Sequence, residues 1–344
     1  MEKVLIITHT QDNECINIVS DKIRKHGGEP IRFNVDEYPL KYSLSSCFEN
    51  GEWKIYLDYE GANRVALHEL AGLWYRRSFN LGGNLATVLE REYLGSVYGE
   101  IRATFFGFLE SLPCFQIGKY SKYRRLDSKE EQMRIADFLG MKVPETCITN
   151  SPEEAKRFFR DHPNGVVTKM QSSFAIERDG VENVVFTNLI KEEDLDNIET
   201  LQYCPMQFQE KLDKKVELRI TIVGDEIYAF EIDSQKLDNA KLDWRREGIE
   251  LLSDWKPYEL PADLRDKLLQ MMDMYEVNYG AIDIIVTPDD NYYFLEINAA
   301  GEFFWLDRLL PDNPISDQIA KVLLGKANRR YTPVFDKTNV SSLI

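Results

Sequence analysis

Cysteine and histidine are scarce in this sequence and show no pairing. Its five cysteines form no C-x-x-C pair, and its four histidines lack the spacing of metal ligands. An odd number of isolated cysteines fits reduced thiols in a cytosolic protein. We therefore expect neither a zinc site nor a disulfide framework.

Long apolar runs and an excess of basic residues are also missing. The longest apolar runs, Val4 to Thr8 and Ile282 to Val286, have the length of strands and not of membrane spans. Residues 1–7 show no secretory cleavage site, so the expected location is the cytoplasm. The 42 Lys and Arg residues stand against 58 Asp and Glu, and the net charge of -16 repels nucleic-acid phosphates. Neither nucleic acid nor membrane is an expected partner, whereas a homodimer stays open.

The first 120 residues indicate an α/β lobe. A chain of 344 residues exceeds what one hydrophobic core usually serves, which favours two or three lobes. Val4 to Thr8 is typical of a buried strand, and Glu14 to Lys25 has the apolar spacing of a helix. The turn between them lacks G-x-G-x-x-G, so a dinucleotide site and hydride transfer lose their support. Further strands are expected at 31–33, 53–56 and 73–75, and a long helical region at 85–112.

Two more lobes are expected in the rest of the chain. Residues 121–206 predict a small α+β lobe, with a helix from Lys129 to Leu139, a strand from Thr146 to Thr149 and a helix capped by Ser151. Residues 207–325 predict a sheet-rich lobe with one helix from Ala262 to Tyr275 and strands at 218–223, 226–232, 281–287 and 292–297. The polar residues 326–344 predict a tail or a strap over the body.

The strongest chemical signal is a set of oxygen-bearing side chains on two consecutive strands. Glu296 and Asn298 are two residues apart and leave the same face of one strand. Asp283 lies on the preceding strand, and a hairpin brings it to that face. Such ligands, with room for water and phosphate oxygens, suit Mg²⁺ bound through a nucleotide. Acids that merely flank a hairpin are the alternative, but the neighbouring residues are apolar, which places these charges among buried side chains.

Asp283, Glu296, Asn298 and Gly301 together resemble the metal motif of ATP-grasp enzymes. The resemblance implies a three-lobe ATP-grasp fold of α/β and α+β parts, with ATP and Mg²⁺ held between the central and C-terminal lobes. Lys129 and Lys169 match the two lysines that reach the nucleotide phosphates in that family.

The resemblance also implies a nucleotide site. The segment from Phe208 to Leu212 resembles the hinge whose backbone binds adenine, which assigns Gln209, Glu210, Lys211 and Leu212, and Glu217 resembles the acid that binds ribose. An ordinary strand with an exposed acid is the alternative. Arg219 and Arg245 supply guanidinium groups for an anionic substrate and are the candidate catalytic residues, while a structural salt bridge is the competing role for each.

The sequence further resembles the ligases that cyclise microviridin-type graspetides, over nearly the whole chain to about Leu324. The resemblance rests on Trp74 to Arg77, Lys169 to Ile176, Leu201 to Glu210, Glu217 to Val223, Asp243 to Arg245 and Gly301 to Phe303. One departure is Ala299-Ala300, where the family usually has Pro after Asn. The resemblance implies that an Asp or Glu side chain of a ribosomal precursor peptide is phosphorylated and then joined to Ser, Thr or Lys, and it favours esters over amides.

Precursor binding is implied at two places. Glu193, Asp194 and Asn197 match the residues that contact the helical leader segment, although acids in the first turn of a helix also offset its dipole. Arg76 and Arg77 are candidates for contacting the acidic core peptide, or else for anchoring an interface between lobes. Another ATP-grasp ligase that adds amino acids to a peptide or protein, and a nucleotide- or peptide-binding protein without turnover, are the alternative functions.

Overall fold

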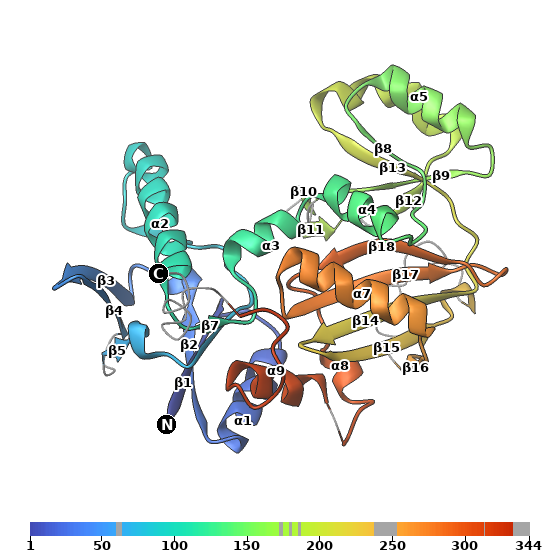
Figure 1. Cartoon of the computed structure of the whole chain (residues 1–344). Helices are drawn as coiled ribbons and strands as arrows, with labels where there is room; N and C mark the ends of the chain where they lie inside the picture. The colour runs from blue at the N-terminus through green and yellow to red at the C-terminus, as the bar shows by residue number, and fades with distance from the viewer. Residues whose placement is uncertain are drawn as a thin grey trace.

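The computed structural model describes residues 1–59, 64–171, 175–178, 181–184, 187–236, 253–312 and 314–332 (Figure 1). These residues form five β-sheets. None of the helices in these ranges combines the length and apolar character needed to cross a bilayer.

A parallel four-stranded sheet forms the centre of the first lobe. Its strand order is β2-β1-β6-β7, with β1 at Glu2–Thr8, β2 at Gly28–Asn34, β6 at Gly72–Tyr75 and β7 at Phe115–Gln116. The helices are α1 (Cys15–Lys25) and α2 (Arg91–Ser111), with short 3₁₀ turns η1 (Val35–Glu37) and η3 (Leu85–Thr87). The expected helical region over 85–112 is therefore interrupted, because Glu90 has an extended backbone and α2 begins after it.

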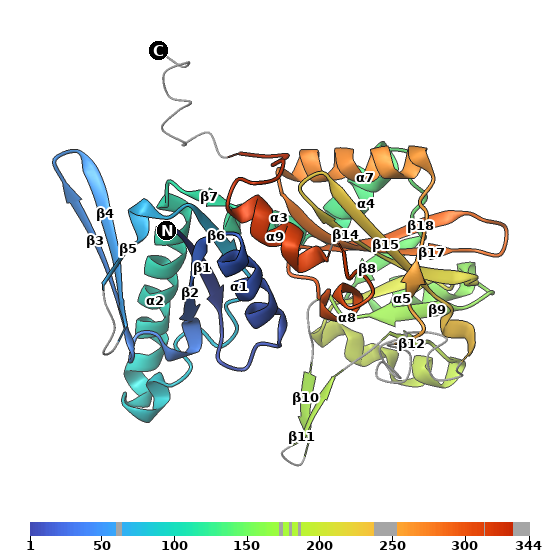
Figure 2. The same cartoon turned by 90° about the horizontal axis from the view of Figure 1, so that it is seen from below.

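A three-stranded antiparallel sheet extends from this lobe, as Figures 1 and 2 show. It consists of β3 (Tyr42–Glu49), β4 (Glu52–Tyr59) and β5 (Val65–Ala66), followed by the 3₁₀ turn η2 (Leu67–Glu69). Only the middle strand was expected from the sequence.

The central part of the chain forms its own sheet, of order β12-β9-β13-β8. Its strands are β8 (Thr146–Thr149), β9 (Val166–Lys169), β12 (Asn188–Leu189) and β13 (Met206–Glu210). Ser151 caps α5 (Pro152–Asp161) as expected, since its side chain accepts a hydrogen bond from the Glu154 N–H. The other elements are the hairpin β10 (Ala175–Arg178) and β11 (Val181–Val184) and the 3₁₀ helix η4 (Glu192–Tyr203). Because β13 pairs with β8 and β9, this sheet runs four residues past the expected boundary at 206.

The last lobe is a five-stranded antiparallel sheet of order β16-β15-β14-β17-β18. Its strands are β14 (Val216–Val223), β15 (Glu226–Ile232), β16 (Lys256–Pro257), β17 (Tyr279–Val286) and β18 (Tyr292–Asn298), with a 3₁₀ turn η5 (Ser234–Lys236). Helix α4 contacts β18, and α3 contacts α7 (Figure 1). The helices here are α3 (Tyr120–Leu126), α4 (Lys129–Phe138), α7 (Ala262–Tyr275), α8 (Phe304–Asp307) and α9 (Ile315–Leu323).

The first and last lobes share their hydrophobic cores, whereas the central sheet has a small core of its own. One shared core joins Leu5 of β1 to Ile282 of β17, and the other joins Val19 of α1 to Ile319 of α9. The central core contains Ala155, Val166, Leu201 and Phe208. As domain boundaries, residues 120, 206 and 325 stay predictions. The described part of the expected tail, residues 326–332, straps the body, since Arg330 pairs with Asp225 at 2.8 Å and with Asp273 at 2.6 Å.

Candidate active site

Three neighbouring strands place the predicted metal ligands on one face of the last sheet. Arg219 of β14 lies opposite Asp283 of β17, which lies opposite Glu296 of β18. Asn298 lies opposite Ala281, two residues along from this row and on the same face. The expectation that the hairpin brings Asp283 to the face of Glu296 is confirmed. A register shift after Asp283 leaves Leu295 without an opposite residue, and such bulges re-aim side chains beside active sites.

Glu296 is the most strongly held carboxylate of this face. The Lys129 ammonium donates to it at 2.6 Å, and the Asn298 amide donates at 3.1 Å. Burial alone would raise the pKa of Glu296, but the charges of Lys129 and Lys169 and these two hydrogen bonds lower its pKa well below the usual range. Glu296 is therefore ionised, and both predicted phosphate lysines act on it.

Arg219 neutralises the second carboxylate of the row. Its Nη1 donates to both oxygens of Asp283, at 2.9 and 3.0 Å, and its Nη2 donates to the Glu302 carbonyl at 3.1 Å. Burial opposes the charge of Arg219, yet Asp283 raises the pKa of the guanidinium above its usual value. The salt bridge considered from the sequence is thus present, and it lies within the candidate site.

The donor set of this face fits Mg²⁺ held together with nucleotide phosphates. It offers two ionised carboxylates and one amide oxygen, which are hard ligands of the kind Mg²⁺ prefers. Within the described ranges, no group of three or more His, Cys, Asp or Glu residues is close enough to hold a metal by protein ligands alone. Mg²⁺ usually takes one or two carboxylates from a protein, and substrate phosphates and water supply its remaining ligands.

The predicted nucleotide segment lies at the end of β13. The Gln209 side chain is buried and donates to Thr146 Oγ1 at 3.0 Å, so it is engaged within the central sheet. The backbone N–H groups of Glu210 and Lys211 donate to the carbonyls of Glu145 and Gly165. Leu212 lies in no described helix or strand, so its backbone groups are the ones to consider for adenine.

The predicted ribose ligand also has a partner within the protein. Glu217 forms an ion pair with Lys214 at 3.1 Å, and both side chains are largely buried. Glu217 lies two residues before Arg219 on β14, so both side chains leave the same face of the sheet. The nucleotide roles of Glu217 and of residues 209–212 stay predictions.

A loop after β18 joins this face to the first lobe. The carbonyls of Ala300, Gly301 and Glu302 accept hydrogen bonds from Arg76, Tyr279 and Arg219 respectively, the last two at 2.6 and 3.1 Å. There is no space for a side chain at Gly301, where a Cβ would lie 2.3 Å from that of Ala281.

The Glu302 carboxylate completes the junction. Arg76 pairs with it at 2.7 Å, Asn13 donates to it at 2.7 Å, and Arg77 also pairs with it. Arg76 is 1% exposed and Arg77 is 34% exposed, so both arginines anchor the two lobes and Arg76 is the buried one of the pair. A role of either arginine toward the core peptide stays a prediction. Sequence reasoning assigned no role to Glu302 or Asn13, and the arginine pair after β6 was the only signal that pointed to this junction.

The predicted leader residues lie apart from this junction, at the start of η4. Asp194 accepts a hydrogen bond from the Lys191 N–H at 2.8 Å and so caps the helix, and Glu193 pairs with the Lys191 ammonium at 3.1 Å. Glu193, Asp194 and Asn197 are all exposed, which leaves them accessible to a peptide. Arg245 with its neighbours Asp243 and Trp244 lies outside the described residues, as do residues 172–174 of the predicted family segment.

Comparison with solved structures places this geometry in a known class. An ATP-grasp protein with a RimK domain from Sphaerobacter thermophilus is 13% identical, with a TM-score of 0.56 over 94% of this chain and all of that chain, which shows the fold alone. The macrocyclase MdnC of Microcystis aeruginosa, bound to its precursor peptide MdnA, is 38% identical, with a TM-score of 0.84 over 94% of this chain and 99% of that one. The fold is therefore that of an ATP-grasp ligase.

A second relative narrows the class. A RiPP-associated ATP-grasp ligase of Chryseobacterium gregarium, in complex with ADP and a leader and core peptide, is 55% identical, with a TM-score of 0.91 over 96% of this chain and 99% of that chain. Residues 3–124 match the model of the MvdD pre-ATP-grasp domain. No curated protein sequence matches the chain. The chain belongs to the ATP-grasp ligases associated with ribosomally synthesised, post-translationally modified peptides, the family of the microviridin-type macrocyclases.

Proposed function

We propose that this protein is an ATP-dependent peptide macrocyclase. It transfers the γ-phosphoryl group of ATP to an Asp or Glu side chain of a ribosomal precursor peptide. A Ser or Thr hydroxyl of the same peptide then attacks the acyl phosphate and closes an ω-ester ring, with release of phosphate; a Lys amine would close an ω-amide. The observation that carries the proposal is the row of Arg219, Asp283 and Glu296, in a chain 55% identical to a ligase bound to ADP, leader and core peptide.

The residues of this face and the two lysines have different roles in phosphoryl transfer. Asp283, Glu296 and Asn298 would hold Mg²⁺, which when bound neutralises charge on the phosphates. Lys129 and Lys169 bind phosphate oxygens. In the structure they lower the pKa of Glu296, and a bound nucleotide would offer them a second anion. Arg219 positions the substrate anion from its fixed place on Asp283. No side-chain nucleophile is needed, since positioning and charge stabilisation supply the catalysis.

Precursor binding is assigned to the exposed start of η4. Glu193, Asp194 and Asn197 would contact the leader segment, and their exposure supports this assignment. We also propose a cytoplasmic location, because the ribosomal peptide and Mg-ATP are both available there.

Mass spectrometry combined with an ADP assay tests the proposal. The enzyme is incubated with Mg-ATP and the leader and core peptide of the Chryseobacterium gregarium ligase. We expect the core to lose one water for each ADP formed, and mild base to restore the mass because it hydrolyses esters. Base-stable loss of water would instead show amides. ADP formation that needs a free amino acid, with a gain in mass, would contradict macrocyclisation. Glu296→Gln, which keeps the side-chain shape, is the inactive control.

A further inference from the structure

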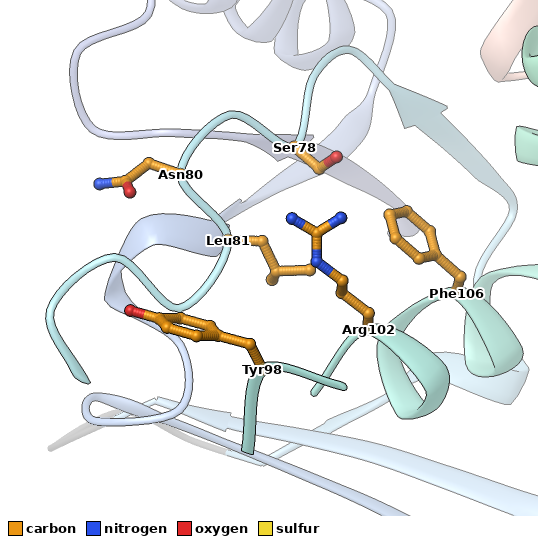
Figure 3. Close-up of a pocket in the computed structure, with 6 residues that line it drawn as sticks. All are labelled: Ser78, Asn80, Leu81, Tyr98, Arg102 and Phe106. Atoms are coloured by element: carbon orange, nitrogen blue, oxygen red, sulfur yellow. The ribbon is translucent and has the colours of Figure 1, made fainter. Parts of the chain in front are cut away.

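A cavity in the first lobe is separate from the face that carries the metal ligands. Its volume is about 320 Å³, at the lower end of the range for small-ligand sites (Figure 3). One wall is the loop after β6, and the other is a single face of α2 whose residues are four apart. The lining residues are Ser78, Asn80, Leu81, Tyr98, Arg102 and Phe106.

Packing around the cavity holds its walls in place. Phe106 stacks on Tyr120, the first residue of α3, with ring centroids 3.9 Å apart. Ser78 and Tyr75 share a hydrogen bond of 2.6 Å, which ties the loop to the end of β6. The cavity therefore lies beyond the carboxyl end of a parallel strand, where open α/β sheets usually bind their ligands.

Arg102 gives the cavity its chemistry. Its guanidinium points toward Ser78, with the rings of Phe106 and Tyr98 on either side (Figure 3). It forms no ion pair with any residue in the described part of the chain, although the protein carries a net charge of -16. A guanidinium with a hydroxyl nearby and aromatic walls is suited to a carboxylate on a partly apolar ligand.

The cavity is joined through the chain to the active-site loop. Ser78 directly follows Arg77, so their Cα atoms are about 3.8 Å apart. The Arg77 guanidinium in turn pairs with Glu302, four residues after Asn298. The strands β1 and β2 point toward the same side of the molecule as the β10–β11 hairpin (Figure 2). The cavity is thus linked to the loop after β18 through Arg77 and Glu302.

We propose that this cavity binds an acidic side chain of the precursor's core peptide that is not the one being phosphorylated. The inference rests on the proposed function, which supplies a peptide with several carboxylates. Arg102 binds one carboxylate and so sets which other acid of the core reaches the metal face. Arg102 is thus a specificity-determining residue that takes no part in the chemical step.

Direct binding and turnover are both measured to test this. Wild type, Arg102→Gln and the control Arg91→Gln are titrated with the Chryseobacterium gregarium core peptide by calorimetry, with its leader present and without ATP. Arg91 begins the same helix, is exposed and lies outside the cavity. We expect Arg102→Gln to weaken core binding about tenfold, because exposure places this charged hydrogen bond at the low end of its usual range. The KM for ATP should stay unchanged, and Arg91→Gln should bind as wild type does.

A second set of peptides identifies the carboxylate. In core peptides with one acid at a time changed to its amide, one peptide should bind wild type and Arg102→Gln equally, because it lacks the group that Arg102 contacts. Equal binding of the unchanged core by wild type and Arg102→Gln, or no binding to either, overturns the cavity assignment. Arg102-dependent binding without ADP formation would support the cavity and contradict the macrocyclase. If Arg102→Gln binds and cyclises the core as wild type does, the macrocyclase is supported and the cavity assignment is contradicted.

Discussion

Removal of the Glu302 carboxylate should destabilise the junction between the first and last lobes. Arg76 is 1% exposed. Burial opposes its charge, but nearby Cys15 and Glu302 raise the pKa of the guanidinium above its usual value, so Arg76 stays charged. In Glu302→Ala the Arg76 guanidinium still donates to the Ala300 carbonyl, but it has lost the Glu302 carboxylate that balances its charge. Breaking a buried pair from one side costs about 3 to 5 kcal/mol, and the 24% exposure of Glu302 places the expected loss near 3 kcal/mol.

Urea unfolding of Glu302→Ala, Arg76→Met and the double variant measures this loss. The double variant should be more stable than Glu302→Ala, because it leaves no buried charge without a partner. The matched control is Glu14→Ala, which removes an exposed ion pair with Arg308 and should cost less than about 1 kcal/mol. A loss in Glu302→Ala no larger than that of Glu14→Ala, or a double variant less stable than both single ones, would refute the reasoning.

Three further predictions concern catalysis, precursor binding and acid stability. Glu296→Ala should abolish ADP formation, because metal ligands supply several kcal/mol of transition-state stabilisation; activity near the wild-type rate would remove the metal assignment. Asp194→Ala should weaken leader binding by about 1.5 to 3 kcal/mol in a titration. Asp194→Asn can still accept the Lys191 N–H, so it removes the charge but keeps the helix cap and shows which of the two matters for binding. For Asp317, burial raises the pKa, but bonds from Lys321 and His26 lower it overall. The ionised Asp317 thus stabilises the fold above the usual Asp pKa of about 3.9, and this stabilisation is lost as the pH falls. The free energy of unfolding of Asp317→Asn should therefore decrease less steeply with falling pH than that of wild type. The same decrease for both proteins in calorimetry would count against this.

Elements with a strong local signal were predicted well from the sequence. The expected helix from Ala262 to Tyr275 and the expected strand from Thr146 to Thr149 agree with α7 and β8 in both bounds. Strand β3 was missed because half of its eight residues are polar and five of the eight are exposed, and its pairing with β4 compensates. Helix α3 was missed because it is short and rich in charged residues, so its contacts with α2, α4 and α7 stabilise it more than its own sequence does.

The candidate site also contains some residues that the sequence could place and others that it could not. Glu296 and Asn298 are placed on one face by strand periodicity. Asp283 lies opposite Glu296 only because the register shifts after Asp283, and nothing in the sequence signalled that bulge. The ion pair that joins Arg77 to Glu302 spans 225 positions of sequence. No periodic pattern connects such distant residues, so the partner of the arginine pair could be found only in the folded chain.

Helix α9 of the last lobe is synthesised long after α1, the helix of the first lobe that it covers. Helix α9 packs on α1, and Leu324 lies close to Ile23 beside Gly28. About 190 residues separate the end of the matched first domain from α9, which corresponds to roughly 10 to 40 s of synthesis. During that interval the side of α1 that packs on α9 has no cover. Residues 1–124 produced alone would leave the same side of α1 exposed, and we expect this fragment to aggregate more readily than the full chain.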